Sequence, residues 1–451
     1  MKLSDSLMIA GAGLLTVLAL THSAHAQSAD ALIDKLVEKG ILSTKEANEL
    51  REEADKGFTT SYQVKSGMPD WVTSLRLGGD LRLRYDGIYI DDPAAPDRNR
   101  LRYRLRFGLT AVLKDNFEVG VRLTSAEAAS GLGAGGGGNP ISGNDSFSDN
   151  GSKKLVFVDL AYAKWTVNRP KWGLSITGGK MENPFVFSDV LFDPDYTPEG
   201  FGEQVSYNIS DQHALRLNLG EFVLDEISAS SRDPYMGGAQ LRWDSTWSPK
   251  VQTSFGISAL AITGTDGLNN TAVPNQNRGN TRINVGTTNA PVFIPATHFN
   301  PIIGDGAVTY TLASFPCYTG AFPIRVAGDY VVNPAADSKN EGWDAGITFG
   351  KSGKKGTWEV TYRYKNLEAD MWWEELVDSD TGAFYKGTPT GGSSGYGAGT
   401  NLRGHTVRGV YSPTDSLSFA VTYYLYDLID EVPPGSDSHA DRIQVDAIWK
   451  F

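Results

Sequence analysis

The chain has 451 residues, of which 50 are glycine, 11% are aromatic and 21% are charged, and its formal net charge is -12 at pH 7. This length suits two or three soluble domains or one large barrel, and the acidic balance excludes a nucleic-acid binder, which needs a basic face. The single cysteine, Cys317, excludes an intrachain disulfide and a multi-cysteine metal site.

The first 26 residues have the composition of an export signal. Lys2 supplies a positive end, the stretch from Leu7 to Leu20 is a short apolar core, and Ala24-His25-Ala26 is a small-residue cleavage site. We therefore expect the mature chain to begin near Gln27. Beyond this stretch, no apolar run is long enough for a membrane-spanning helix.

Residues 27–57 are predicted to form a helical hairpin in the periplasm. Gly40 ends the first helix, and Ser43 with Glu46 forms a capping box that starts the second. The residues fit a solvated hairpin, an oligomerisation segment or a tether to a periplasmic partner equally well. Residues 58–70 are expected to be a linker that leads into a barrel of residues 71–451.

From Trp71 onward the chain is nearly all alternating segments. The clearest runs from Leu101 to Phe107, where apolar residues alternate one by one with Arg102, Arg104 and Arg106. An extended strand would place all the apolar side chains on one face and all the arginines on the other, whereas a helix would mix them. An amphipathic strand of a soluble sandwich would show the same alternation.

The connections between these segments alternate between short and long, which is typical of outer-membrane barrels and has no reason to occur in a sandwich. The short turns are Lys114–Asn116, Asn168–Lys171, Ser210–Gln212, Ser248–Lys250, Lys351–Lys355 and Ser412–Ser416. The long links are Asp91–Asn99, Glu127–Lys153, Glu182–Gly200, Asp225–Pro234, Gly264–Asn340, Glu368–Thr400 and Leu428–His439. Thirteen connections predict an all-β, antiparallel, up-and-down transmembrane barrel of 14 strands. The length of Gly264–Asn340 leaves 16 strands as the alternative, because that link could hide a hairpin.

Aromatic residues near the short turns and the chain end fit a girdle at the periplasmic interface. They are Trp71, Trp165, Trp172, Trp247, Phe349, Trp358, Tyr411 and Trp449. The last segment, from Ile443 to Phe451, also alternates and ends on an aromatic residue. This ending resembles the signal by which the barrel-assembly machinery receives bacterial outer-membrane barrels.

Two enzyme patterns occur in glycine-rich loops without the flanking strand and helix that their chemistry needs. Gly131–Gly136 matches a dinucleotide fingerprint, and Gly391–Gly395 matches a hydrolase elbow. The histidines after the signal have no paired ligand spacing, and Pro198 occupies the position where a calcium loop would need glycine. We therefore expect no catalytic residues, no bound metal and no cofactor.

Three stretches resemble the bacterial family called putative porins, which are outer-membrane barrels of Gram-negative bacteria. They are Gly178–Gly200, with its motif Asp193-Pro194-Asp195-Tyr196, Gly399–His405, and Asp441–Phe451. The helical segment after the signal also resembles the mature N-terminus of that family. The resemblance implies a pore in the outer membrane and does not name a substrate.

If the apolar faces meet lipid, the other faces line water and their charges set the field of the pore. The expected pore-lining residues are Arg82, Arg84, Arg102, Arg104, Arg106, Arg122, Glu118 and Asp446. The six arginines, called the arginine ladder below, would form a basic wall that favours anions. The opposing interpretation is that Asp80, Glu118 and Asp446 neutralise the ladder.

The link Glu182–Gly200 carries four acids, Asp189, Asp193, Asp195 and Glu199, that could fold into the lumen as a constriction. The sequence thus predicts a porin for passive diffusion of ions and small hydrophilic solutes, surrounded by outer-membrane lipids, with a homo-oligomer left open. The alternative is a plugged barrel that serves adhesion or envelope anchoring. An outer-membrane enzyme finds no support in the residues.

Overall fold

The computed structural model of the chain describes residues 69–93, 95–129, 137–269 and 279–451. The predicted signal (1–26), the helical hairpin (27–57) and all but the last two residues of the linker (58–70) lie outside these residues. By its contacts the chain divides into two units, Met1–Thr73 and Ser74–Phe451. No helix in the described part of the chain has the length and apolar character that crossing a membrane requires.

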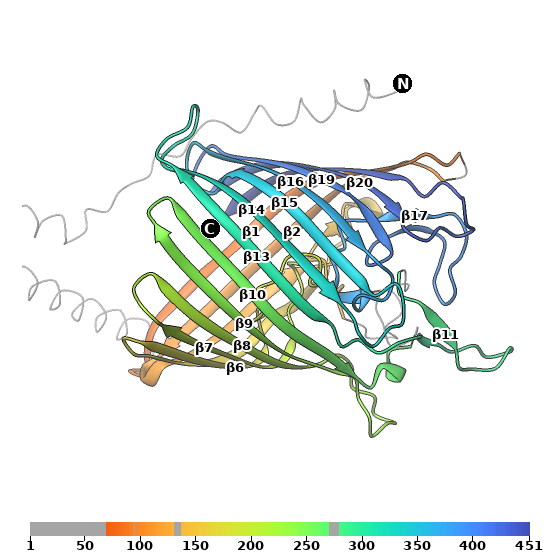
Figure 1. Cartoon of the computed structure of the whole chain (residues 1–451), viewed down its shortest axis with the longest axis horizontal. Helices are drawn as coiled ribbons and strands as arrows, with labels where there is room; N and C mark the ends of the chain where they lie inside the picture. Colours follow the sequence, from red (N-terminus) through yellow and green to blue (C-terminus); the bar gives the residue numbers. More distant parts are fainter. Residues whose placement is uncertain (1–68, 94, 130–136, 270–278) are drawn as a thin grey trace, which may run out of the picture. The chain divides into compact units, whose positions relative to one another are not determined.

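The second unit is a closed antiparallel β-barrel, which confirms the predicted fold class (Figure 1). One sheet contains seventeen strands, and one of them, β4 (Asp145–Ser146), is a two-residue addition to β2. The other sixteen each pair with their neighbours in chain order, and β1 pairs with β21 to close the ring. These sixteen strands are β1 (Val72–Ile90), β2 (Arg98–Leu113), β3 (Phe117–Ser125), β5 (Val156–Asn168), β6 (Trp172–Lys180), β7 (Glu199–Asn208), β8 (His213–Val223), β9 (Tyr235–Ser248), β10 (Val251–Thr263), β13 (Ile302–Leu312), β14 (Phe322–Val332), β15 (Glu341–Gly350), β16 (Thr357–Leu367), β19 (Leu402–Ser412), β20 (Leu417–Leu428) and β21 (Ala440–Lys450).

The main prediction of 14 strands is wrong, and the alternative of 16 is confirmed. The link Gly264–Asn340 contains β13 and β14, which pair with each other along their whole length. Gly304, Gly306 and Gly328 lie on the outward face of these strands, the same face as the exposed side chains of Val308 and Val326. Because glycine carries no side chain, the apolar half of the alternation is missing there and the sequence pattern is weak.

Two small hairpins and four short 3-10 turns complete the described secondary structure. The hairpins are β11 (Arg282–Asn284) with β12 (Phe293–Pro295), and β17 (Ala383–Tyr385) with β18 (Gly395–Gly397). The turns are η1 (Lys114–Asn116), η2 (Asp149–Gly151), η3 (Thr265–Gly267) and η4 (Glu374–Leu376). All of these lie in connections between barrel strands.

The two faces of the barrel wall differ in polarity, as the alternation in β2 predicts. The side chains of Leu101, Leu105 and Phe107 point outward and are 54%, 43% and 45% exposed, whereas Arg102 is 6% exposed. Strand β5 shows why its inward side is not evident from sequence. A bulge beside Asp159 shifts the register, so that Val158 and Ala161 both follow the outward face.

An apolar core lies inside the barrel, where connections fold back against the inner wall. It includes Val190, Leu191 and Phe192 of the β6–β7 connection, and Met371, Trp372 and Trp373 of the β16–β19 connection. Inward side chains of the wall, such as those of Phe222, Ile303 and Leu367, pack against them. The connections therefore occupy part of the barrel interior.

Candidate functional site: the charged interior and its infolded loops

The arginine ladder lies on the inner face of three neighbouring strands. Arg82 and Arg84 belong to β1, Arg102, Arg104 and Arg106 to β2, and Arg122 to β3. Arg82, Arg84 and Arg102 are buried, with 9%, 5% and 6% of their surface exposed. The alternation of the strands holds these side chains in one patch because every second residue faces the same side.

Carboxylates on the same wall meet part of the ladder. Arg84 stands opposite Asp446 in the β1–β21 register and binds it with a 2.7 Å bond from Nε. Nη2 of Arg104 lies 2.9 Å from Asp80. Glu118 accepts a 2.7 Å hydrogen bond from the Tyr162 hydroxyl, and within the described part of the chain it makes no ion pair with the ladder.

The connection between β6 and β7, residues 181–198, folds into the interior and is called loop A below. Its Asp195 lies between Arg104 and Arg106 and makes ion pairs with both, the first at 2.9 Å. Its Asp189 reaches another part of the wall, where it pairs with Arg363 at 2.6 Å and Lys365 at 2.9 Å. Loop A is thus bound to two sectors of the barrel through its carboxylates.

The four predicted constriction acids do not all lie together. Asp193 is buried and accepts bonds from the backbone N–H groups of Asp195 and Ser379, both 2.8 Å long. Glu199 is instead the first residue of β7, and it pairs with Lys180 at 3.0 Å with 64% of its side chain exposed. Three acids therefore lie in the interior and the fourth stays at the strand end.

The β16–β19 connection, residues 368–401, also folds inward, which the sequence does not predict, and is called loop B below. The indole N–H of Trp372, which is fully buried, donates a 3.0 Å bond to the carbonyl of Leu191 in loop A. Asp380 of loop B pairs with Arg84 at 3.0 Å and with Arg442 at 3.3 Å. The available signal is the group of large apolar residues between Met371 and Val377, which flanks Glu374 and Glu375 and is unusual in a solvated loop.

Four carboxyls of loops A and B, those of Asp193, Asp370, Glu374 and Asp378, have a pKa that burial raises. Burial raises the pKa of Asp193 well above its usual range, and the neighbouring charge of Asp378 adds to this effect. Burial likewise raises the pKa of Asp378 to about 7, although Lys365 acts in the opposite direction. Near neutral pH, the interior therefore holds fewer negative charges than the count of acids indicates.

The pKa values of Asp195 and Asp380, which bind arginines of the ladder, shift the other way. For Asp195 the effect of burial is outweighed by Arg104 and Arg106, which lower its pKa to about 2. For Asp380, Arg84 is the main cationic partner that holds the pKa well below the usual range despite burial. These two carboxylates stay charged across the physiological pH range.

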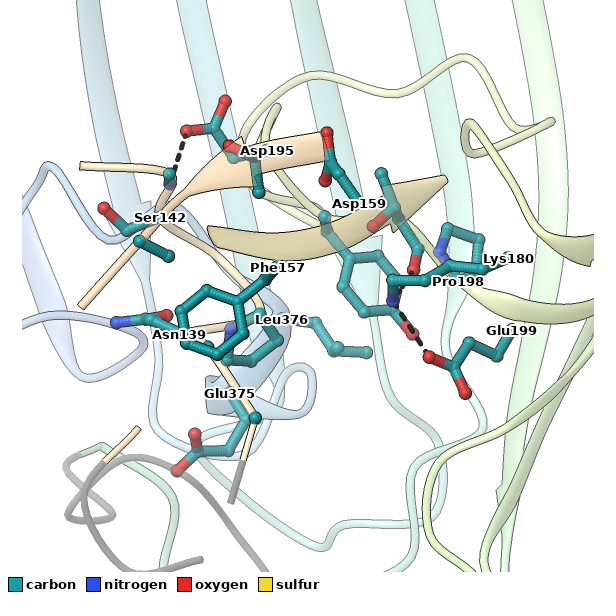
Figure 2. A pocket seen from close by; sticks show the side chains of 18 of the residues that line it. Asn139, Ser142, Phe157, Asp159, Lys180, Asp195, Pro198, Glu199, Glu375 and Leu376 are labelled. Atoms are coloured by element: carbon teal, nitrogen blue, oxygen red, sulfur yellow. Dashed lines mark hydrogen bonds and ion pairs between the residues drawn. The ribbon is translucent and has the colours of Figure 1, made fainter. Parts of the chain in front are cut away.

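Two cavities are lined by residues of both loops. The one in Figure 2 has a volume of about 410 Å³ and is lined by Asp195, the Lys180–Glu199 pair, Phe157 and Glu375, among others. A second cavity, called the ladder cavity below, has a volume of about 370 Å³. It is bounded by Arg82, Arg84 and Arg104 of the wall and by acids of loops A and B, including Asp195 and Asp380. Within the described residues, no group of three or more His, Cys, Asp or Glu side chains is arranged to hold a metal ion.

Comparison with known proteins supports the resemblance predicted from the residues. The family described as Putative porin matches residues 91–294 of this chain. No curated protein sequence matches it. The similar solved structures include OprB of Pseudomonas putida, with 10% identity over 88% of this chain and 97% of OprB and a TM-score of 0.47. OmpF of Salmonella typhi in complex with daunomycin has 10% identity over 84% of this chain and 97% of OmpF, with a TM-score of 0.43.

Proposed function

We propose that the protein is an outer-membrane porin, a water-filled channel through which ions and small hydrophilic solutes diffuse passively. The single observation that carries this proposal is the inverted polarity of the barrel wall, with apolar side chains such as Leu105 exposed outside and arginines inside. A soluble barrel would bury the apolar face and expose the charged one. The match to the Putative porin family supports the same conclusion.

Loops A and B narrow the interior, and their acids offset most of the ladder. Arg84 faces two carboxylates, Asp446 and Asp380, and Arg104 faces Asp80 and Asp195. The proposed anion preference is therefore weaker than six unpaired arginines would produce. Recordings in planar bilayers test both parts of this proposal. A porin gives stepwise currents, and a porin that prefers anions gives a reversal potential with the sign expected for anion selectivity.

Replacing Arg102, Arg104 and Arg106 together by glutamine is expected to move the reversal potential toward cation preference. An unchanged potential and conductance would show that the ladder does not set selectivity. Arg216→Gln is the matched control. Arg216 is also an arginine of the inner face, but it does not belong to the ladder and pairs with Asp244.

A plugged barrel that serves adhesion or envelope anchoring is the second candidate, and the apolar core inside the barrel favours it. Residues such as Leu191 and Trp372 fill space that an open channel would leave to water. Stepwise currents from the purified protein separate the two candidates, because a plugged barrel conducts none.

A further inference from the structure

Among the described residues that line the ladder cavity, one arginine makes no ion pair with a carboxylate. Of the five lining arginines, Arg84, Arg104, Arg363 and Arg408 each have a carboxylate oxygen within 4.0 Å. Among the described residues, Arg82 has none at this distance. Its recorded contact is a 2.7 Å bond from Nη2 to the Asn144 side-chain oxygen.

Arg82 is also deeply buried and incompletely hydrogen-bonded. Only 9% of its surface is exposed, and its Nε has no partner among the described residues. Burying a guanidinium away from water without a partner is costly, and buried polar groups are normally satisfied. A guanidinium presents five N–H donors in a planar fork that matches a carboxylate. Asp195 and Asp446 act on the charge of Arg82 only from beyond ion-pair distance, so the fork of this guanidinium is free to bind an added carboxylate.

From this we infer that the ladder cavity is a binding site for the carboxylate of a small organic monoanion, held by Arg82. The inference rests on the proposed channel function and names the class of solute that the channel selects. A volume of about 370 Å³ is sufficient for a molecule of this size, and Ile141, Pro194 and Ile448 offer apolar surface to its body.

The surrounding charges favour one negative charge over two. Asp195, Asp380 and Asp446 line the same cavity and are engaged with Arg84 and Arg104. A single carboxylate would balance the charge of Arg82, whereas the second charge of a phosphate dianion would meet these carboxylates. Coulomb repulsion at such short range is strong in a partly dehydrated interior.

Benzoate is the probe for the test, with benzylammonium and inorganic phosphate as comparisons. Isothermal titration calorimetry of the detergent-purified protein is expected to detect binding of benzoate and no binding of benzylammonium. Phosphate is expected to bind more weakly than benzoate. Arg82→Gln should weaken benzoate binding at least about tenfold, the factor that 1.4 kcal/mol represents. Arg82→Lys should give an intermediate loss, because it keeps the charge without the fork. Arg216→Gln, which does not line the cavity, should bind benzoate like the unchanged protein.

Benzoate binding that persists in both Arg82 variants would overturn the inference, as would phosphate binding more tightly than benzoate. If Arg82→Gln does not fold, Arg82→Lys provides the test. Single-channel recordings with and without benzoate separate this inference from the proposed function. Stepwise currents that benzoate does not change would reject the binding site and support the porin function. Benzoate binding that depends on Arg82, in a protein that gives no currents, would support the site and reject the porin function.

Discussion

The carboxylate of Asp195 connects loop A to two neighbouring arginines of the ladder. It makes ion pairs with Arg104 and Arg106, and its second oxygen accepts a 3.3 Å bond from the backbone N–H of Gly143. Three segments of the chain therefore meet at one side chain. Because each arginine is largely shielded from water, removing the charge of Asp195 leaves Arg104 and Arg106 to share the carboxylate of Asp80.

Asp195→Asn is expected to destabilise the folded protein by about 1–3 kcal/mol, the cost of leaving buried charged donors without their acceptor. It should also shift the reversal potential toward anions, since one negative charge leaves the ladder. Chemical denaturation in detergent and planar-bilayer recordings measure the two effects. Asp244→Asn, whose partner Arg216 is more exposed, is the control; an equal effect there would contradict a special role for Asp195.

Loops A and B fold inward together and hold each other in place. Trp372 of loop B packs against Phe192 and donates its indole bond to Leu191, both in loop A. The backbone adds a 2.7 Å bond from the Asp193 N–H to the Leu376 carbonyl. Neither loop has a regular element long enough to be stable alone, so their position depends on these mutual contacts.

Trp372→Ala should loosen both loops, because deleting a buried tryptophan side chain costs about 3–5 kcal/mol. We expect faster proteolysis within loop B and a higher single-channel conductance. Trp247→Ala provides the control, because Trp247 is about half exposed beside a short turn. A conductance equal to that of the unchanged protein would place loop B outside the conducting path.

The raised pKa of Asp378 makes loop anchoring depend on pH. The folded protein holds this proton up to about pH 7, whereas the ordinary aspartate value is 3.8. The contribution of Asp378 to stability is therefore complete below the ordinary value of 3.8, declines as pH rises, and is lost once pH has risen through about 7. Asp195 acts oppositely: its contribution is complete above the ordinary value and is lost only as pH falls through about 2.

Hydrogen exchange of loop B is expected to be at least about tenfold slower at pH 5 than at pH 8, after correction for the intrinsic rate, since each unit of pKa shift is worth a factor of about ten. Asp378→Asn should remove most of this difference. A pH dependence that survives the substitution would mean that another group is responsible.

At the scale of the whole barrel, the stabilising arrangement reverses that of a soluble protein. The outward residues of β2 and its neighbours are apolar and exposed, and the inner wall carries the ion pairs. An apolar exterior of this extent is stable in lipid. A charged residue on the outer face destabilises such a barrel most at the middle of the bilayer and least near its interfaces.

Leu105→Lys, near the middle of β2, should cost about 2–4 kcal/mol in a bilayer, the range for a lysine at the midplane. Val119→Lys, the third residue after the short turn Lys114–Asn116, should cost about 0–1 kcal/mol because it lies near the interface. Equilibrium unfolding by urea in lipid vesicles measures both. Equal costs at the two positions would argue against a membrane at this depth.

Much of the architecture follows from local sequence. Alternation with period two predicts amphipathic strands, and the sorting of connections by length predicts a barrel; both depend on residues a few positions apart. The count of fourteen is wrong where glycine removes the apolar half of the alternation at positions 304, 306 and 328. The bulge at Asp159 similarly hides the inward face of β5.

The interior depends on contacts between residues that are far apart in the chain. Asp446 meets Arg84 across 362 positions, Trp372 meets Leu191 across 181, and Arg82 meets Asn144 across 62. No local pattern encodes which carboxylate reaches which arginine, because closing the ring and folding two loops inward determine these neighbours. Residue types alone therefore predict a charged lumen, whereas the pairing that leaves Arg82 without a carboxylate is visible only in the assembled barrel.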